Sequence, residues 1–192
     1  MQVIRFMTHP EVVIDPAVPV PDWPLSAEGL RRTHLMLEQS WPGSLGSLFT
    51  SAERKARDMA DVLGARLGLA PQILVALGEN DRSATGYLPR AEFEQVADAF
   101  FAAPEQSIRG WERAADAQER IVAAVGQVVA LAHADGDIGI IAHGGVGALL
   151  LAHIKGVPIS RAQDQPGGGG GNYFAFTAQG HALVHGWRSI EG

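Results

Sequence analysis

The feature that most constrains the fold is the apolar run at residues 138–142, which leads directly into His143-Gly144-Gly145. An apolar run without polar alternation is typical of a strand that is buried on both faces of a sheet. The stretch 138–154 contains no formally charged residue, so we expect a buried helix to follow the glycines. A strand that turns at once into a buried helix is typical of parallel α/β folds.

The rest of the chain continues this alternation. Strands are predicted at residues 3–8, 45–49, 73–76, 173–177 and 182–187, and helices at residues 26–39, after residue 50, around 93–100 and at 112–134. Ser26 is a predicted N-cap, with Leu30, His34 and Leu37 on one helix face. Thr50 and Glu53 have the spacing of a capping box. The pattern predicts a three-layer α/β/α sandwich with a mostly parallel central sheet, in one domain spanning residues 1–192.

Composition and charge narrow the class of protein. The chain has 192 residues, a formal net charge of −6 and no cysteine, which excludes disulfides, thiol catalysis and cysteine zinc sites. No block of lysine or arginine is present, so we expect no nucleic-acid partner, although a local pocket for a small anion is compatible with this charge.

No membrane segment or secretory signal is predicted. The stretch 138–154 is apolar but short for a bilayer span, and it holds two histidines and four glycines. The first ten residues carry Arg5 inside an apolar run and lack the layout of a signal peptide. We therefore expect a cytoplasmic protein. The sequence predicts no particular oligomeric state.

Two histidines hold equivalent places in the pattern. His9 follows the first predicted strand, and His143 follows the strand at 138–142. Ligands of parallel sheets bind at the carboxyl ends of the strands, so both side chains should project at one edge. The glycines after His143 and the start of the next helix are suited to an anion. Ser51 and Lys55 lie at a third strand-to-helix junction, where they can add a hydroxyl and a cation.

Five segments, in this order, carry a resemblance. They are Thr8-His9-Pro10, Leu25-Ser26-Ala27-Glu28-Gly29, the stretch from Thr50-Ser51 to Met59-Ala60, Leu77-Gly78-Glu79 and Ala142-His143-Gly144-Gly145-Val146. In order and spacing they resemble the motifs of the histidine phosphatase superfamily, whose fold is phosphoglycerate-mutase-like. The resemblance covers about the first 150 residues, and the His-Gly-Gly-Val turn is its strongest match.

The resemblance implies a phosphoryl-transfer site. His9 would be the nucleophile that becomes a phosphohistidine, and His143 would bind the phosphoryl oxygens. Glu79 would protonate the leaving oxygen and then activate water, with Asp81 as a competitor for that role. A histidine is a competent nucleophile when a hydrogen bond at one ring nitrogen leaves a lone pair on the other.

The chain departs from the family pattern around the phosphate. Thr8 and Lys55 stand where the family usually has arginines, and Pro10 replaces a glycine and removes a backbone donor. Arg82 is the best compensating cation, ahead of Arg5, Arg54 and Arg57. The predicted phosphate-binding residues are therefore Thr8, Ser51, Lys55, Arg82 and Gly144. No cofactor or metal is expected, although a metal site on His9, His143 and Glu79 is a low-ranked alternative.

Two functions remain open. The first is a phosphatase-type hydrolase that acts on a small phosphomonoester, and the second is a weakly active or inactive module that binds phosphate, a phosphorylated ligand or a protein partner. The five-glycine run at 167–171 has two interpretations as well, a flexible linker or a loop at the active edge. In the second, Asp164, Gln165 and Asn172 would supply polar contacts.

Overall fold

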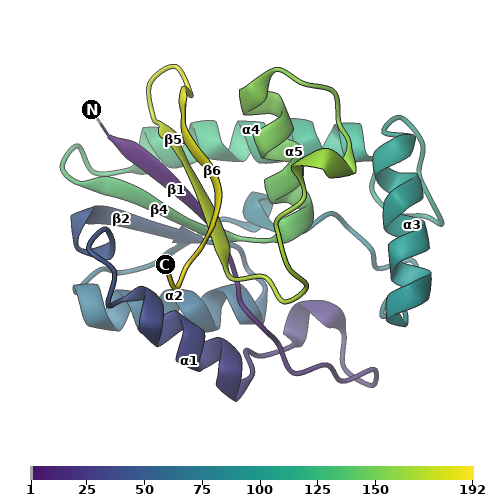
Figure 1. The fold of residues 1–192 in the computed structure, drawn as a ribbon, viewed down its shortest axis with the longest axis horizontal. Helices are drawn as coiled ribbons and strands as arrows, with labels where there is room; N and C mark the ends of the chain where they lie inside the picture. The colour runs from purple at the N-terminus through teal and green to yellow at the C-terminus, as the bar shows by residue number, and fades with distance from the viewer. Residues whose placement is uncertain (1) are drawn as a thin grey trace.

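The computed structural model describes residues 2–192, and its centre is a six-stranded sheet (Figure 1). The strands are β1 (Val3–Thr8), β2 (Leu45–Thr50), β3 (Gln72–Ile73), β4 (Asp137–Ala142), β5 (Asn172–Thr177) and β6 (Leu183–Ser189). Their order across the sheet is β3-β2-β4-β1-β5-β6. The pairs among β1 to β4 are parallel, whereas β5 and β6 add antiparallel pairs. The predicted mostly parallel sheet is confirmed.

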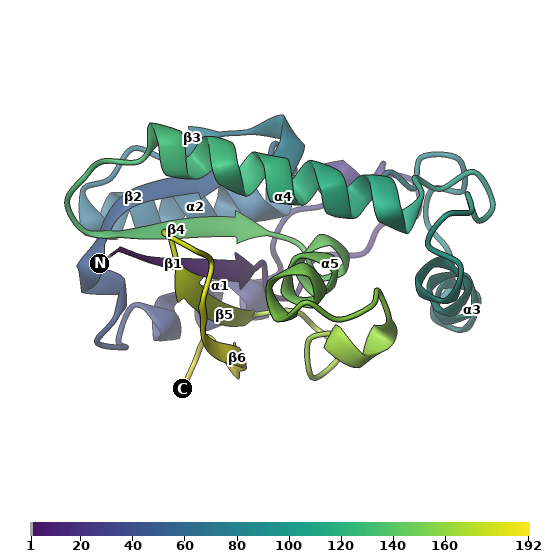
Figure 2. The same cartoon turned by 90° about the horizontal axis from the view of Figure 1, so that it is seen from above.

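Helices cover both faces of the sheet (Figure 2). The helices α1 (Ala27–Met36) and α2 (Arg54–Leu67) lie on one face, and α4 (Ala114–Leu131) and α5 (Gly144–Lys155) lie on the other. The helix α3 (Arg90–Ala102) packs beside α5. Short 3-10 helices occupy Val20–Asp22, Pro42–Ser44, Val75–Leu77 and Arg161–Gln163. The three predicted layers are confirmed.

Alternate side chains of each central strand enter different cores. Phe6 of β1 and Ile140 of β4 belong to the cluster beneath α4 and α5, whereas Met7 and Ile141 belong to the cluster beneath α1 and α2. This is the alternation of side chains that every strand imposes. Burial on both faces explains why the run at 138–142 has no polar residue. Among residues 2–192, no helix has the length and apolar character needed to cross a membrane.

The N-cap of α1 is confirmed, but the buried face of this helix is not the predicted one. Ser26 Oγ accepts the Gly29 N–H over 3.0 Å. A side chain on Gly29 would collide with the backbone oxygen of Glu11, so this glycine lets the two segments touch. The face that packs inward therefore lies one residue earlier than predicted, at Gly29, Thr33 and Met36 rather than Leu30, His34 and Leu37.

Two other local predictions are wrong. The predicted strand at 73–76 is only the two-residue β3, followed by a 3-10 helix in which Val75 is 77% exposed. The predicted capping box fails because Thr50 is still part of β2 and α2 begins at Arg54, with Glu53 at its N-cap. The Glu53 side chain makes no capping hydrogen bond, because its carboxylate is used elsewhere.

A close backbone contact beside β2 gives a test of the fold. The β2–β4 register shifts around Gly46, and a Cβ on Gly46 would collide with the backbone oxygen of Asp135. We expect Gly46→Ala to lower the free energy of unfolding by about 1–3 kcal/mol, the usual cost of overpacking. Urea denaturation measures this change. Gly43→Ala is the matched control, since nothing lies within 4 Å of a Cβ there. Equal stabilities of the two variants would contradict the contact.

Candidate active site

The pairing of β1 with β4 places two histidines together at the carboxyl edge of the sheet. Thr8 is in register with Ala142, and the His9 N–H donates to the Ala142 carbonyl over 3.2 Å. The ring centroids of His9 and His143 are 5.2 Å apart, with the rings edge to face. The prediction that both side chains project from the same edge is confirmed.

His9 is held as a neutral ring with one nitrogen available. Its Nδ1 lies 2.8 Å from the carbonyl oxygen of Pro10, which can only accept, so Nδ1 carries the hydrogen and Nε2 keeps a lone pair. Burial, together with His143 and Lys55, lowers the pKa of His9 to about 3. At neutral pH the imidazole is therefore uncharged, and its Nε2 is nucleophilic.

His143 is almost fully buried, with only 1% of its surface exposed. Its Nε2 lies 2.8 Å from Ser51 Oγ and 3.3 Å from Glu53 Oε1, and its Nδ1 has no hydrogen-bond partner. Beside an ionised carboxylate, Nε2 carries the hydrogen. Burial lowers the pKa of His143, although Glu53 and Glu79 oppose the shift. The site thus holds an unpaired buried nitrogen close to the His9 ring.

Lys55 is connected to His143 through Glu53. Its Nζ lies 2.5 Å from Glu53 Oε2 and donates to the Val20 carbonyl over 2.8 Å. Burial favours the neutral acid, but His143 and Lys55 lower the pKa of Glu53 to about 2. Lys55 is 4% exposed and does not line the cavity described below. The structure therefore does not bring this ammonium group to the phosphate contact that the sequence predicts.

Glu79 occupies the N-terminus of α5. Its Oε2 accepts the Gly145 N–H over 3.0 Å, and its Oε1 accepts the Val146 N–H over 2.9 Å. Burial raises the pKa of this carboxyl, but Arg82, His143 and the Gly145 N–H hold it below its usual value. The His-Gly-Gly turn does hold an anion, as expected, but for these two amides that anion is an internal carboxylate.

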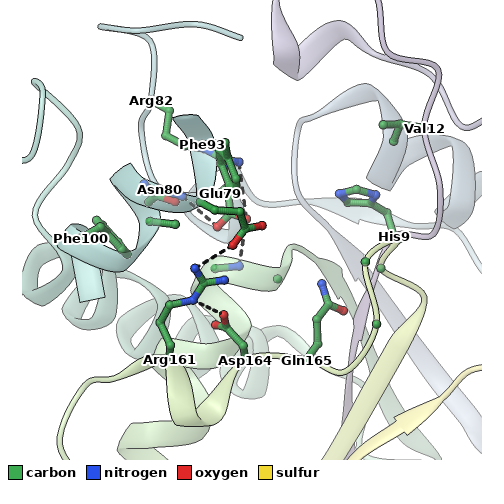
Figure 3. A pocket seen from close by; sticks show the side chains of 18 of the residues that line it. His9, Val12, Glu79, Asn80, Arg82, Phe93, Phe100, Arg161, Asp164 and Gln165 are labelled. Atoms are coloured by element: carbon green, nitrogen blue, oxygen red, sulfur yellow. Dashed lines mark hydrogen bonds and ion pairs between the residues drawn. The ribbon is translucent and has the colours of Figure 1, made fainter. Parts of the chain in front are cut away.

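Asp81, the competing carboxylate, lies elsewhere. It is exposed, it accepts the Ser83 N–H over 2.8 Å, and it does not line the cavity. The Glu79 side chain lines the same cavity as His9 (Figure 3). Of the two carboxylates that the sequence left open, the geometry favours Glu79.

A cavity of about 370 Å³ opens in front of His9 (Figure 3). Its lining includes residues after β1, the start of the 79–89 loop, aromatic side chains of α3 and Gly144. Arg161, Asp164, Gln165 and the glycines 167–170 also line it. The Gly171 N–H donates to the His9 carbonyl over 3.1 Å, and a Cβ on Gly170 would collide with that oxygen. The glycine run is therefore a loop at the active edge and not a linker.

Arg82 is the predicted compensating cation that reaches this cavity. Its guanidinium lies 5.2 Å from the ring centroid of Phe93 and 5.5 Å from that of Trp111. Its Nη2 is 3.7 Å from Glu79 Oε2. The other candidates do not line the cavity: Arg5, Arg54 and Arg57.

A second arginine, Arg161, lines the cavity but is surrounded by carboxylates. Its guanidinium donates to Glu94 over 2.9 Å, to Asp98 over 2.7 Å and to Asp164 over 2.7 Å. Two of these acids, Glu94 and Asp164, line the cavity too. The charge of Arg161 is therefore already balanced within the protein.

Thr8 is fully buried and does not line the cavity. Its Oγ1 donates to Gln165 Oε1 over 2.6 Å and accepts the Asn172 N–H over 3.0 Å. Gln165 itself does line the cavity. The structure thus places Thr8 behind a residue that can contact a ligand. Gln165 and Asn172 are two of the polar residues that the sequence associates with the glycine run.

Two polar residues of the site are not among the predicted site residues. Glu53 Oε1 accepts the Glu79 N–H over 3.0 Å, in addition to the contacts of Glu53 with His143 and Lys55. Asn80 lines the cavity, and its buried Nδ2 has no partner. The only sequence feature that could have indicated Glu53 and Asn80 is their position, since each lies within two residues of a predicted site residue. Within residues 2–192, no cluster of three or more histidine, cysteine or acidic side chains is arranged to hold a metal ion.

The lowered histidine pKa values predict how stability depends on pH. A folded pKa of about 3 for His9, against 6.5 in an unfolded chain, means that the unfolded state binds more protons between these values. The free energy of unfolding should therefore fall as the pH drops from 6.5 toward 3, and His9→Asn should reduce this slope. Urea denaturation of both proteins at several pH values measures it. Identical slopes would show that His9 titrates normally.

Comparisons with known proteins bear on the family and the fold. A sequence model described as the histidine phosphatase superfamily (branch 1) matches residues 16–182. Comparison with curated protein sequences gives no match.

Solved structures share the fold. YhfR of Bacillus stearothermophilus has a TM-score of 0.80 at 21% identity, covering 97% of this chain and 95% of that one. A mycobacterial glucosyl-3-phosphoglycerate phosphatase with inorganic phosphate has a TM-score of 0.75 at 21% identity and covers 100% of both chains. Its complex with VO3 gives 0.75 at 23% identity, covering 98% and 96%. Because the family model spans most of the sequence, the protein belongs to the histidine phosphatase superfamily.

Proposed function

We propose that this protein is a phosphatase that hydrolyses a small phosphomonoester through a phosphohistidine intermediate on His9. The observation that carries the proposal is the state of the His9 ring. Its Nδ1–H is fixed on the Pro10 carbonyl and its pKa is about 3, so Nε2 presents a lone pair beside the cavity. The structural relatives solved with inorganic phosphate and VO3 support a phosphate-sized ligand at such a site.

The reaction has two steps. In the first, His9 Nε2 attacks phosphorus, an N–P bond forms, and the ester P–O bond breaks with its electron pair on the leaving oxygen, which takes up a proton. In the second, water attacks the phosphohistidine and loses a proton, the N–P bond breaks, and inorganic phosphate leaves. Both steps concentrate negative charge on the phosphoryl oxygens, which the protein has to stabilise.

Three groups of the site are suited to that charge. Asn80 Nδ2 is a buried donor without a partner, and Arg82 brings a cation to the cavity wall. His143 Nδ1 is unpaired, and an anion beside it favours the protonated ring, whose Nε2–H already faces Glu53. Binding of phosphate should therefore be accompanied by proton uptake at His143.

Glu79 is the proposed proton carrier. In the free protein its pKa is lowered, so the carboxylate is ionised. A phosphoryl dianion in the cavity raises that pKa by charge repulsion, and the proton then held by Glu79 passes to the leaving oxygen. In the second step the same carboxylate removes the proton from water.

The cavity favours an ester whose organic part carries no further negative charge. Four carboxylates line it, Glu11, Glu79, Glu94 and Asp164, against the two guanidiniums of Arg82 and Arg161. Beyond Glu79, its wall consists of aromatic side chains, Phe93, Phe100, Phe101 and Trp111. A phosphate with an apolar or aromatic leaving group meets less repulsion there than one with a carboxylate or a second phosphate.

One observation favours the alternative, a weakly active or inactive module that binds a phosphorylated ligand. Neither Thr8 nor Lys55 lines the cavity, so Arg82 is left as the cation nearest to Glu79. A single guanidinium clamps a transferring phosphoryl group less well than several cations do. Binding of phosphate without turnover of any ester would favour this alternative.

His9→Asn tests the nucleophile. We expect phosphate release from phenyl phosphate or p-nitrophenyl phosphate to fall by at least about 10³-fold, because no other group replaces a nucleophile that forms the intermediate. Acid-quenched mass spectrometry of the wild type should find one added phosphoryl group on His9. His153→Asn, at an exposed position on α5, is the matched control. Full activity of the His9 variant would exclude the mechanism.

The charge of the cavity predicts a substrate preference. We expect kcat/KM for phenyl phosphate to exceed that for 3-phosphoglycerate by at least about tenfold, since ~1.4 kcal/mol of added repulsion is sufficient. Initial rates of phosphate release measure both values. Glu94→Gln removes one lining carboxylate and should narrow the ratio. A preference for the carboxylate-bearing ester would show that the lining charges do not select the substrate.

A further inference from the structure

We propose that Gln165 is a phosphoryl-binding residue whose amide N–H groups are aimed into the active site by Thr8 and Asn172. The proposal rests on the phosphatase function above and adds a neutral donor to its phosphate site. The sequence associates Gln165 with the glycine run only as a polar contact and gives its amide no role at the phosphate. The hydrogen-bond network behind the cavity wall carries the proposal.

The orientation of the Gln165 amide is fixed from behind. Asn172 Nδ2 donates to the Pro166 carbonyl over 3.0 Å and to the Gly170 carbonyl over 3.3 Å, so this amide group is a donor on that side. The same Nδ2 lies 3.1 Å from the Gln165 side chain, which must therefore present its oxygen. Thr8 Oγ1 donates to that oxygen over 2.6 Å.

With its oxygen facing Thr8 Oγ1 and Asn172 Nδ2, Gln165 turns Nε2 toward the cavity. Figure 3 shows this nitrogen directed into the cavity between His9 and Glu79. A Cβ on Gly144 would collide with Nε2, so the amide lies directly over the first residue of α5. No hydrogen bond from Nε2 to another group exists within residues 2–192. Its two hydrogens are thus free for an oxyanion.

Thr8 gains a physical role from this arrangement. The family pattern has an arginine where this chain has Thr8, and the threonine supplies no charge. Its hydroxyl is instead a positioning group that accepts the backbone N–H of Asn172 and donates to Gln165 Oε1. A preorganised donor loses little entropy when the ligand arrives, which favours tight and oriented binding.

Calorimetry with inorganic phosphate and orthovanadate tests the inference apart from turnover. We expect Gln165→Leu to weaken vanadate binding by roughly 10- to 100-fold, the usual effect of losing a hydrogen bond to a charged group. Gln163→Leu is the matched control, because Gln163 lies outside the cavity and its side chain bonds Lys155. Thermal unfolding checks that both variants are folded.

Thr8 variants test the positioning role. Thr8→Val should lose most of the same affinity, Thr8→Ser should restore it, and Thr8→Val combined with Gln165→Leu should bind no worse than Gln165→Leu alone. If the losses of affinity in the two single variants add up in the double variant, Thr8 does not act through Gln165. Wild-type vanadate binding that Gln165→Leu leaves unchanged would overturn only the assignment of Gln165. A wild type that binds neither anion would overturn the proposed function itself.

Discussion

The parallel pairing of β1 with β4 is the constraint on which the rest of the structure depends. Its register sets His9 beside His143, and alternate side chains on both strands enter the two cores. A slip by one residue would exchange the faces of every side chain in the strand, sending Phe6 and Met7 into the wrong cores. The packing of the two hydrophobic cores therefore fixes the strand register, and the register fixes the relative position of His9 and His143. No polar contact between the histidines is needed for this.

The electrostatics of the site follow from burial. Two buried histidines are kept neutral, while two carboxylates near them, Glu53 and Glu79, are kept ionised by specific partners. Each buried charge is matched within the protein, as Lys55 matches Glu53. An unmatched buried charge would cost several kcal/mol, which explains why the lysine at the motif position turns inward rather than toward the cavity. For the proposed phosphoryl ligand, the site thus offers mainly neutral donors and the guanidinium of Arg82.

Features that follow from hydrophobic periodicity could be predicted from the sequence. Features that depend on a single tertiary contact could not. The apolar run at 138–142 and the shared edge of His9 and His143 could be predicted because burial and strand order determine them. The buried face of α1 could not be predicted, because it depends on the close approach of Glu11 to Gly29, a tertiary contact that helical periodicity does not encode. The roles of Thr8 and Lys55 were missed for a similar reason. Each side chain donates a hydrogen bond to a residue distant in sequence, Thr8 to Gln165 and Lys55 to the Val20 carbonyl.

The glycine loop beside His9 has a consequence for affinity. Gly167, Gly168, Gly169 and Gly170 form part of the wall, yet they present no side chains to a ligand. They offer only peptide groups, which distinguish molecules by shape and hydrogen bonding rather than by apolar fit. Glycine has more backbone freedom to lose than any other residue, so a ligand that immobilises this segment forfeits part of its binding free energy. For the proposed phosphatase, that loss would weaken the binding of the phosphate product.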